Sequence, residues 1–111
     1  MKALTAAPWF DSRITQLKPE PVTPVALERC HALAYLDTVD QELTALRDAD
    51  REGLSTGDVV ISGGSRRPAL LAAGAPCQAV DLVVSGKAKN AFCVARPPGH
   101  HARPAQGMGF C

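Results

Sequence analysis

One stretch of the chain has the apolar spacing of an amphipathic helix. Its large apolar residues recur at steps of three and four, at Leu36, Val39, Leu43 and Leu46. Acidic residues between them can face water, and Gly53 provides a stop. We therefore predict a helix whose apolar side packs into a core. A shorter helix should precede it and run to about His31, because Thr23 followed by Pro24 is typical of an N-cap with proline in the first turn.

A second apolar stripe lies between residues 66 and 84. It comprises Leu70, Ala73, Cys77, Val80 and Val84. This spacing predicts a helix over residues 66–84 that closes at residues 85–87. Gly74 and Pro76 interrupt the stripe, and they predict a kink or a late start near Pro76 because proline lacks the N–H of a helical hydrogen bond.

Two short runs have the composition of strands. Val59–Ile61 is β-branched, and the Ser-Gly-Gly-Ser segment at residues 62–65 can form a turn that caps the helix after it. Ala91–Ala95 is wholly apolar between polar boundaries, which fits a strand buried on both faces of a parallel sheet. With 46% hydrophobic and 5% aromatic residues, the composition favours an α/β fold in which helices pack on a buried sheet.

Length, charge and cysteine content narrow the class of protein. A chain of 111 residues allows one domain or a piece of one. Its net charge of +1 and the lack of a basic stripe argue against direct binding of nucleic acid. No segment approaches the roughly 18 consecutive apolar residues of a membrane span. The four cysteines form no Cys-x-x-Cys pair, so we expect a reduced, cytoplasmic protein with mostly buried structural thiols.

The residues with candidate catalytic chemistry directly follow the predicted strand at Ala91–Ala95. Residues 96–99, Arg-Pro-Pro-Gly, should leave it through a stiff turn, in the position beyond a strand where α/β folds usually bind ligands. His100 and His101 are consecutive and cannot share a helix face, so they suit two adjacent roles better than joint chelation of one metal. One imidazole could accept a proton while its neighbour supplies charge. Taken alone, such a pair also fits a solvated loop or a core hydrogen bond.

The surrounding residues give the histidine pair a context. Residues 96–102 are Arg-Pro-Pro-Gly-His-His-Ala, and residues 107–111 are Gly-Met-Gly-Phe-Cys. Together they resemble the core signature of the zinc-dependent histone deacetylase and acetylpolyamine amidohydrolase superfamily, in the form found in its class II and bacterial branch. Weaker resemblance extends upstream, through residues 17–23, 30–36 and 58–65. The resemblance implies that this segment is part of a three-layer α/β/α, arginase-like domain with a parallel sheet, and that helices dominate the segment.

The resemblance also implies roles for individual residues. His101 matches the general base, which also serves as general acid, and His100 matches the neighbour that stabilises developing charge. Gly109 matches a backbone contact near the acyl group, Phe110 a wall of the acyl channel, and Asp58 a rim carboxylate that binds the substrate backbone. The implied substrate is an acetylated lysine or an acetylated polyamine. His31, in the weaker upstream match, is interpreted as structural.

The metal ligands implied by the family do not match any residues of this chain. The resemblance places them after Cys111 and places the opening strand of the domain before Met1. Residues 1–111 are therefore expected to be a partial N-terminal portion, with the Zn²⁺ of the full-length domain bound by residues outside it. A zinc site from Cys93, His100, His101 and Cys111 would have intervals that fit no standard structural spacing. We expect the isolated chain to be marginally stable and to lack appreciable deacetylase activity.

Three other interpretations remain open at this level. The segment could belong to an acetylpolyamine deacetylase, which acidic residues and insertions at the channel mouth would distinguish. It could be a non-catalytic binding or regulatory module that keeps the deacetylase shape. A purely structural helical domain is the third, although it leaves the proline-rich turn and the paired histidines unexplained together.

Overall fold

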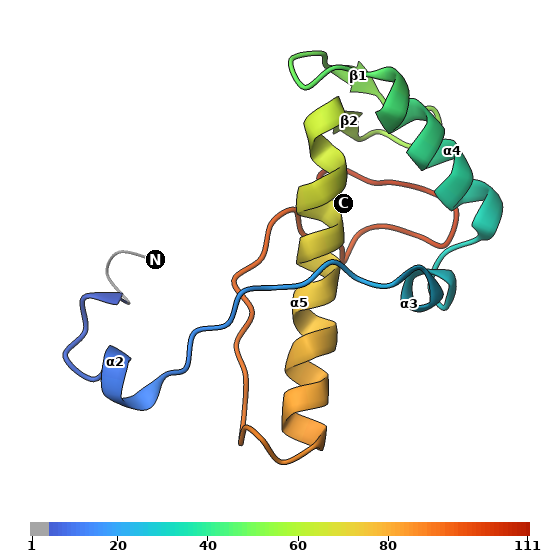
Figure 1. Cartoon of the computed structure of the whole chain (residues 1–111). Helices are drawn as coiled ribbons and strands as arrows, with labels where there is room; N and C mark the ends of the chain where they lie inside the picture. Colours follow the sequence, from blue (N-terminus) through green and yellow to red (C-terminus); the bar gives the residue numbers. More distant parts are fainter. Residues whose placement is uncertain (1–4) are drawn as a thin grey trace.

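A long helix forms the axis of the molecule in this computed structural model, which describes residues 5–111 (Figure 1). The elements in chain order are α2 (Phe10–Arg13), α3 (Pro24–Glu28), α4 (Leu33–Ala45), β1 (Glu52–Gly53), β2 (Val60–Ile61), the 3₁₀ turn η1 (Gly63–Ser65) and α5 (Arg66–Val84). The radius of gyration is 16.1 Å and the extents are 46 × 29 × 20 Å. A compact domain of this length would have a radius near 13 Å. The chain is therefore elongated along α5.

The N-cap prediction for α3 is confirmed. The Thr23 side chain accepts a hydrogen bond from the Ala26 N–H at 3.3 Å, and Pro24 occupies the first turn. The helix ends at Glu28, about one turn before His31. The end is early because the backbone tightens there, where the N–H groups of Cys30 and His31 both donate to the Leu27 carbonyl.

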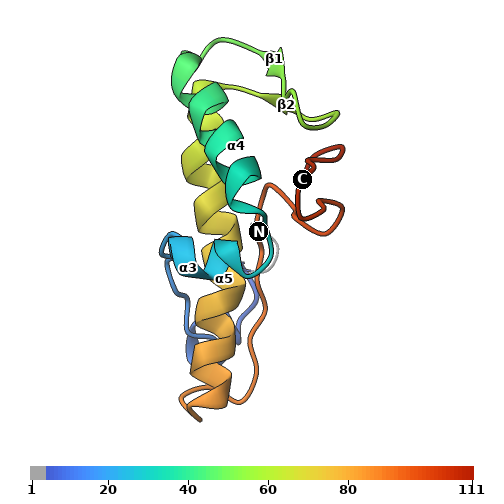
Figure 2. The ribbon, with the colours of Figure 1, turned by 90° about the vertical axis from the view of Figure 1, so that its right-hand side faces the viewer.

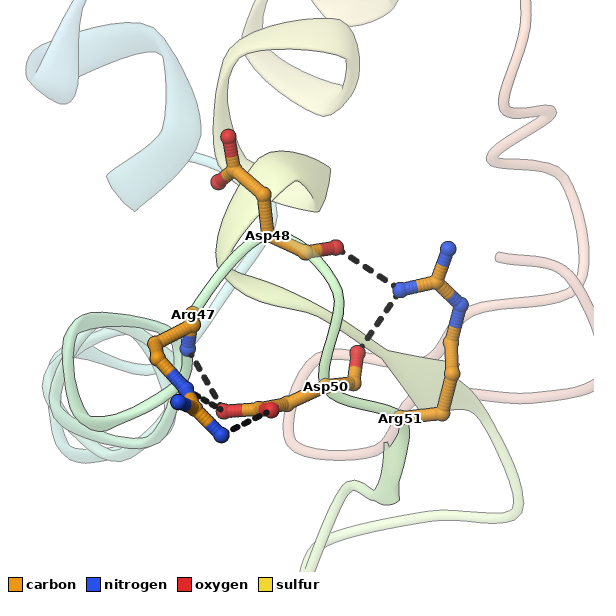
Figure 3. A network of polar contacts seen from close by, with 4 residues as sticks. All are labelled: Arg47, Asp48, Asp50 and Arg51. Carbon is orange, nitrogen blue, oxygen red and sulfur yellow. Dashed lines mark hydrogen bonds and ion pairs between the residues drawn. The ribbon is translucent and has the colours of Figure 1, made fainter.

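Helix α4 carries the predicted apolar side but is shorter than expected. It ends at Ala45, eight residues before Gly53, which is therefore not its stop. Arg47 and Asp50 form a tight turn immediately after the helix. The Asp50 carboxylate accepts from the Arg47 backbone N–H at 2.9 Å and pairs with the Arg47 guanidinium at 3.2 Å, while Arg51 donates to the Asp48 and Asp50 carbonyls (Figure 3). Local polar contacts end the helix here.

A small apolar core lies between α4 and the β1–β2 pair. It consists of Leu43, Leu54 and Ile61, with Tyr35, Val39, Leu46 and Val59 packed around it. Partial burial in this cluster raises the pKa of Tyr35. Strands β1 and β2 are antiparallel, in the register Glu52 to Ile61 and Gly53 to Val60. The predicted β-branched run at Val59–Ile61 is therefore a strand only over its last two residues.

Helix α5 spans residues 66–84 as predicted. It is preceded by a capping box in which Ser62 and Ser65 satisfy each other's backbone N–H groups. Its C-cap is Ser85, and the next residue, Gly86, has φ +75°. The late start near Pro76 is wrong, because the helix runs through that residue. In both views it is drawn without a break (Figures 1 and 2). The arginine at the start of the helix pairs with Asp40 of α4 at 2.5 Å.

The predicted apolar stripe of α5 is buried only in part. Gly74 lies under a strap at residues 20–22, where a Cβ would be 1.9 Å from the Glu20 carbonyl oxygen. Val22 N–H donates to the Leu70 carbonyl at 3.0 Å, which ties the strap to the helix. Beyond the strap, the stripe residues Cys77, Val80 and Val84 are exposed. Contact with the strap, and not apolar periodicity, decides which part of this face is covered.

The strand predicted at Ala91–Ala95 is absent from the described structure. Within residues 5–111 the named strands form one antiparallel pair, and residues 91–95 pair with neither of them. Phe92 is 87% exposed and Val94 63%. The run instead passes back along α5 without a sheet (Figures 1 and 2). The described chain is thus a helix-rich segment, and a parallel sheet would need strands that it does not contain.

The exposure of the cysteine side chains differs from the expectation. Cys30, Cys77 and Cys93 are exposed and Cys111 is half-buried, so the prediction of mostly buried thiols is wrong. No helix within residues 5–111 is long and apolar enough to cross a membrane.

Candidate functional site

The segment with the histidine pair is folded as a series of tight turns. The Ala102 N–H donates to the Gly99 carbonyl at 3.3 Å. Arg103 and Gln106 exchange backbone hydrogen bonds at 2.8 and 3.4 Å, and Met108 and Cys111 do the same at 2.9 and 2.8 Å. Local backbone bonds therefore shape this loop, residues 96–111, without help from a sheet.

The loop docks on the turn between β1 and β2. Gly107 N–H donates to the Thr56 carbonyl at 3.2 Å, and Gly57 and Gly107 form a parallel bridge. A Cβ on Gly57 would lie 2.1 Å from the Gly107 carbonyl oxygen, so only glycine allows this approach. Figure 2 shows the loop next to the turn that joins the two strands. A second anchor lies at the start of α4, where Ala32 N–H donates to the Pro104 carbonyl at 2.9 Å.

The structure brings Asp58 and Gly109 together. The Gly109 N–H donates to the Asp58 carboxylate at 2.7 Å, across 51 residues of sequence. Gly109 has φ +59°, a left-handed conformation that favours glycine. The Phe110 side chain after it is 75% exposed. Two of the predicted site residues, Asp58 and Gly109, are thus directly bonded, and the third, Phe110, follows them in the chain with an exposed side chain.

His100 and His101 lie side by side at the surface of the loop. Their ring centroids are 4.4 Å apart and the rings are tilted by 44°. Both residues are exposed. Within residues 5–111, neither imidazole has a hydrogen bond or an ion pair with a carboxylate. The His101 backbone is held, because its N–H donates to the Cys111 sulfur at 3.4 Å.

The described residues do not assemble a metal site. Among residues 5–111, no group of three or more histidine, cysteine or acidic side chains could hold a metal ion. This includes the combination of Cys93, His100, His101 and Cys111 weighed from the sequence. The residues present therefore do not fit a zinc ion by themselves. An open depression of about 740 Å³ lies between residues 55–58 and residues 103–106, and it includes Asp58 but neither member of the histidine pair.

Several contacts of this site were not found by sequence reasoning. The carbonyl of Thr56 and the close approach at Gly57 hold the loop, and Cys111 contacts the His101 backbone. The available signal was a glycine directly before the expected rim residue Asp58. His31 lies outside the site: its ring packs against Tyr35 at 5.5 Å, and its Nδ1 is buried without a hydrogen-bond partner.

Known proteins are similar to this chain in sequence and in overall fold. The sequence model of the family described as "Histone deacetylase domain" matches residues 1–111. The chain is 37% identical over 111 residues to the histone deacetylase-like amidohydrolase of Pseudomonas aeruginosa, covering 100% of the chain and 28% of that protein. It is 35% identical over 103 residues to a probable deacetylase of Archaeoglobus fulgidus, covering 92% of the chain and 27% of that protein.

A solved structure has the same fold over the whole segment. The crystal structure of the HDA15 HD domain matches with a TM-score of 0.83 at 31% identity, and the match covers 99% of this chain and 30% of that one. The chain thus spans less than a third of the length of each of these proteins.

Proposed function

The chain belongs to the histone deacetylase domain family, and we propose that it carries the proton-handling histidines of a zinc-dependent deacetylase acting on acetylated lysine or a related acetylated amine. The observation that carries the proposal is the loop at residues 96–111. It holds two adjacent exposed imidazoles, and its backbone N–H groups donate to the Thr56 carbonyl and the Asp58 carboxylate. Residues 1–111 would form an N-terminal portion of the complete domain.

In this proposal the two histidines have different roles. His101 accepts a proton from the water that attacks the acetamide carbonyl, and it then gives a proton to the departing amine. His100 stabilises the charge that develops on the reacting group. Imidazole suits both roles because it can change protonation near neutral pH. Their 4.4 Å separation would let both rings face one reacting group.

The neighbouring residues would position the substrate. The Gly109 backbone would contact the acyl group, and the exposed Phe110 ring would form one wall of a channel around the amine stem. Asp58 would bind the substrate backbone at the rim. One of its oxygens already accepts from Gly109, but a carboxylate has two oxygens and can accept further hydrogen bonds.

The zinc ion of the family would be held by residues outside this chain. Residues 5–111 contain no group of three suitable ligands, and residues 1–4 are Met-Lys-Ala-Leu, which adds none. When bound, zinc polarises a carbonyl and acidifies its water. This segment would contribute the proton transfer and part of the channel wall, and the remainder of the domain would contribute the metal.

The test compares this chain with the longest natural protein that contains it. Hydrolysis of an acetyl-lysine peptide and of an acetylated polyamine is measured together with bound zinc. In the longer protein, His101→Ala should lower kcat by about 10²–10⁴-fold, the usual contribution of a general acid–base group. His31→Ala, outside the loop, is the matched histidine control and should leave kcat nearly unchanged. Full activity of His101→Ala would refute the assigned role.

The same assay tests the isolated chain. We expect no appreciable hydrolysis of either substrate by residues 1–111, because their described part does not gather a ligand set. Robust zinc-dependent hydrolysis by the purified chain would contradict this.

A further inference from the structure

Cys111 links the histidine pair to the turn on which the loop docks. Its sulfur accepts the His101 N–H at 3.4 Å, while its own N–H and carbonyl bond to Met108 at 2.8 and 2.9 Å. Gly109, inside the turn that these bonds close, donates to Asp58 at 2.7 Å. The turn at residues 108–111 therefore carries two outside contacts, the Gly109–Asp58 bond and the Cys111–His101 bond, and its own backbone joins them.

We propose that Cys111 and Asp58 are positioning residues for His101, acting through the turn at residues 108–111 that both contacts share. Asp58 fixes the turn at residues 108–111 through its bond to Gly109. Cys111, in the same turn, then holds the backbone of His101 through its sulfur. The imidazoles have no carboxylate partner within residues 5–111, so backbone fixation is what orients the pair in this segment. The importance of this for catalysis rests on the function proposed above, whereas the coupling itself does not.

The contacts explain why both residues are needed. The loop has no sheet around it, and His100 and His101 are exposed, so side-chain packing cannot define their orientation. A sulfur atom is a weak acceptor, and the bond at Cys111 would be easily lost if the turn moved. The charged acceptor at Asp58 makes the stronger bond, because hydrogen bonds to ionised groups are shorter and stronger than neutral ones. The strong Asp58–Gly109 bond therefore fixes the turn at residues 108–111, and this turn places the Cys111 sulfur for its weaker bond to His101.

The experiment is amide hydrogen exchange by NMR on the full 111-residue chain, without substrate or metal. Cys111→Ala should speed exchange of the His101 amide about twofold, the low end for loss of one hydrogen bond, because sulfur is a weak acceptor. Cys111→Ser keeps an acceptor in nearly the same place and should retain most of the protection. A weakened cross-peak between the His100 and His101 rings in Cys111→Ala, but not in Cys111→Ser, would report the orientation directly.

The coupling is tested by substitution at the distant end. Asp58→Ala should speed exchange at Gly109 and also at His101, whereas Asp58→Asn keeps an acceptor oxygen and should protect both. Asp37→Ala, which removes an exposed carboxylate from α4, is the matched control and should change neither. Amides of α5 serve as the internal reference for global stability.

Two results would overturn the proposal. One is an unchanged His101 amide in Cys111→Ala. The other is an Asp58→Ala effect confined to Gly109, which would make Asp58 a local contact only. Because none of these measurements uses activity, loss of the coupling is distinguishable from failure of the proposed enzymatic role.

Discussion

Two regions of the molecule are ordered by different interactions: the lobe formed by α4, β1 and β2, and the loop at residues 96–111. In the lobe, Leu43, Leu54 and Ile61 are buried against one another, so side chains hold the backbone. In the loop, backbone hydrogen bonds hold the chain, and Phe110 and both histidines remain exposed. The lobe has a core of its own, whereas the loop uses the lobe as a support. Residues with candidate chemistry are thus free to face a substrate or other protein segments.

Two apolar runs in these regions show that apolar composition alone does not determine burial. The runs Val59–Ile61 and Ala91–Ala95 are both short and apolar. Ile61 is 7% exposed because it packs with Leu43 and Leu54, whereas Phe92 is 87% exposed because no described strand pairs beside it. An apolar run therefore indicates a segment that could be buried, and only its neighbours decide whether it is.

Removal of a core side chain should have the largest effect on stability. Leu43→Ala leaves a cavity under Leu54 and Ile61, and we expect it to lower the free energy of unfolding by about 2–3 kcal/mol, the low end for such changes because the core is small. The matched control is Leu33→Ala at an exposed position of the same helix, expected within about 0.5 kcal/mol of the parent. Urea unfolding measures both, and equal midpoints would contradict a core in this lobe.

A methyl group at the docking contact should free the loop while leaving the lobe folded. In Gly57→Ala the new Cβ would meet the Gly107 carbonyl oxygen at 2.1 Å, so the backbones must separate at a cost of about 1–3 kcal/mol. Amide exchange at Gly107 and Gly109 should rise accordingly. Gly99→Ala places a methyl where no heavy atom lies within 4 Å, and it should leave both amides protected. Identical behaviour of the two variants would mean that the docking does not depend on this approach.

Acid should weaken a contact between α4 and the β1–β2 turn. Hydrogen bonds from the Ser55 hydroxyl and backbone N–H lower the pKa of Glu42 below its ordinary value. A lowered folded-state pKa contributes stability that is fully present above the ordinary carboxyl pKa of about 4.3 and is lost as pH falls through the lower folded value.

Ser55→Ala tests the direction of this pH dependence of stability. Carbon-13 NMR titration should place the Glu42 pKa of the variant nearer its ordinary value, because the larger of the two contributions has been removed. The stability difference between variant and parent should shrink as pH falls below about 4. A difference that grows on acidification would have the wrong sign for this contact.

The smallest effect is expected in the uncovered apolar run. Phe92→Ala should change the free energy of unfolding by less than about 0.5 kcal/mol, since an exposed ring loses little on truncation. Phe10→Ala is the matched buried control, because Phe10 is 3% exposed, and it should cost clearly more. A large loss of stability in Phe92→Ala, measured by urea unfolding, would show that residues 91–95 are packed in solution.

Prediction from sequence succeeded where the determining contacts are close along the chain. Thr23 and Pro24 predicted the start of α3, and the spacing of apolar residues predicted α5. It failed for two different reasons. The end of α4 depends on local polar contacts between Arg47 and Asp50, which the apolar spacing does not register. The exposure of Ala91–Ala95 depends on the lack of a strand partner among the described residues, which is a property of distant segments. For the candidate site, the family resemblance implied residues and roles that stay predictions, and it did not predict the Asp58–Gly109 bond or the bond at Cys111.

The sequence by itself determined the family, the helical starts and the consecutive placement of His100 and His101. It could do so because caps, periodic apolar spacing and an ordered signature are properties of neighbouring residues. Only the tertiary structure decided that the backbones of Gly57 and Gly107 approach closely, that Asp58 bonds to Gly109 and that Phe92 is exposed. These features depend on segments brought together by folding, or on the absence of such segments, and the spacing of residues along one chain does not specify either.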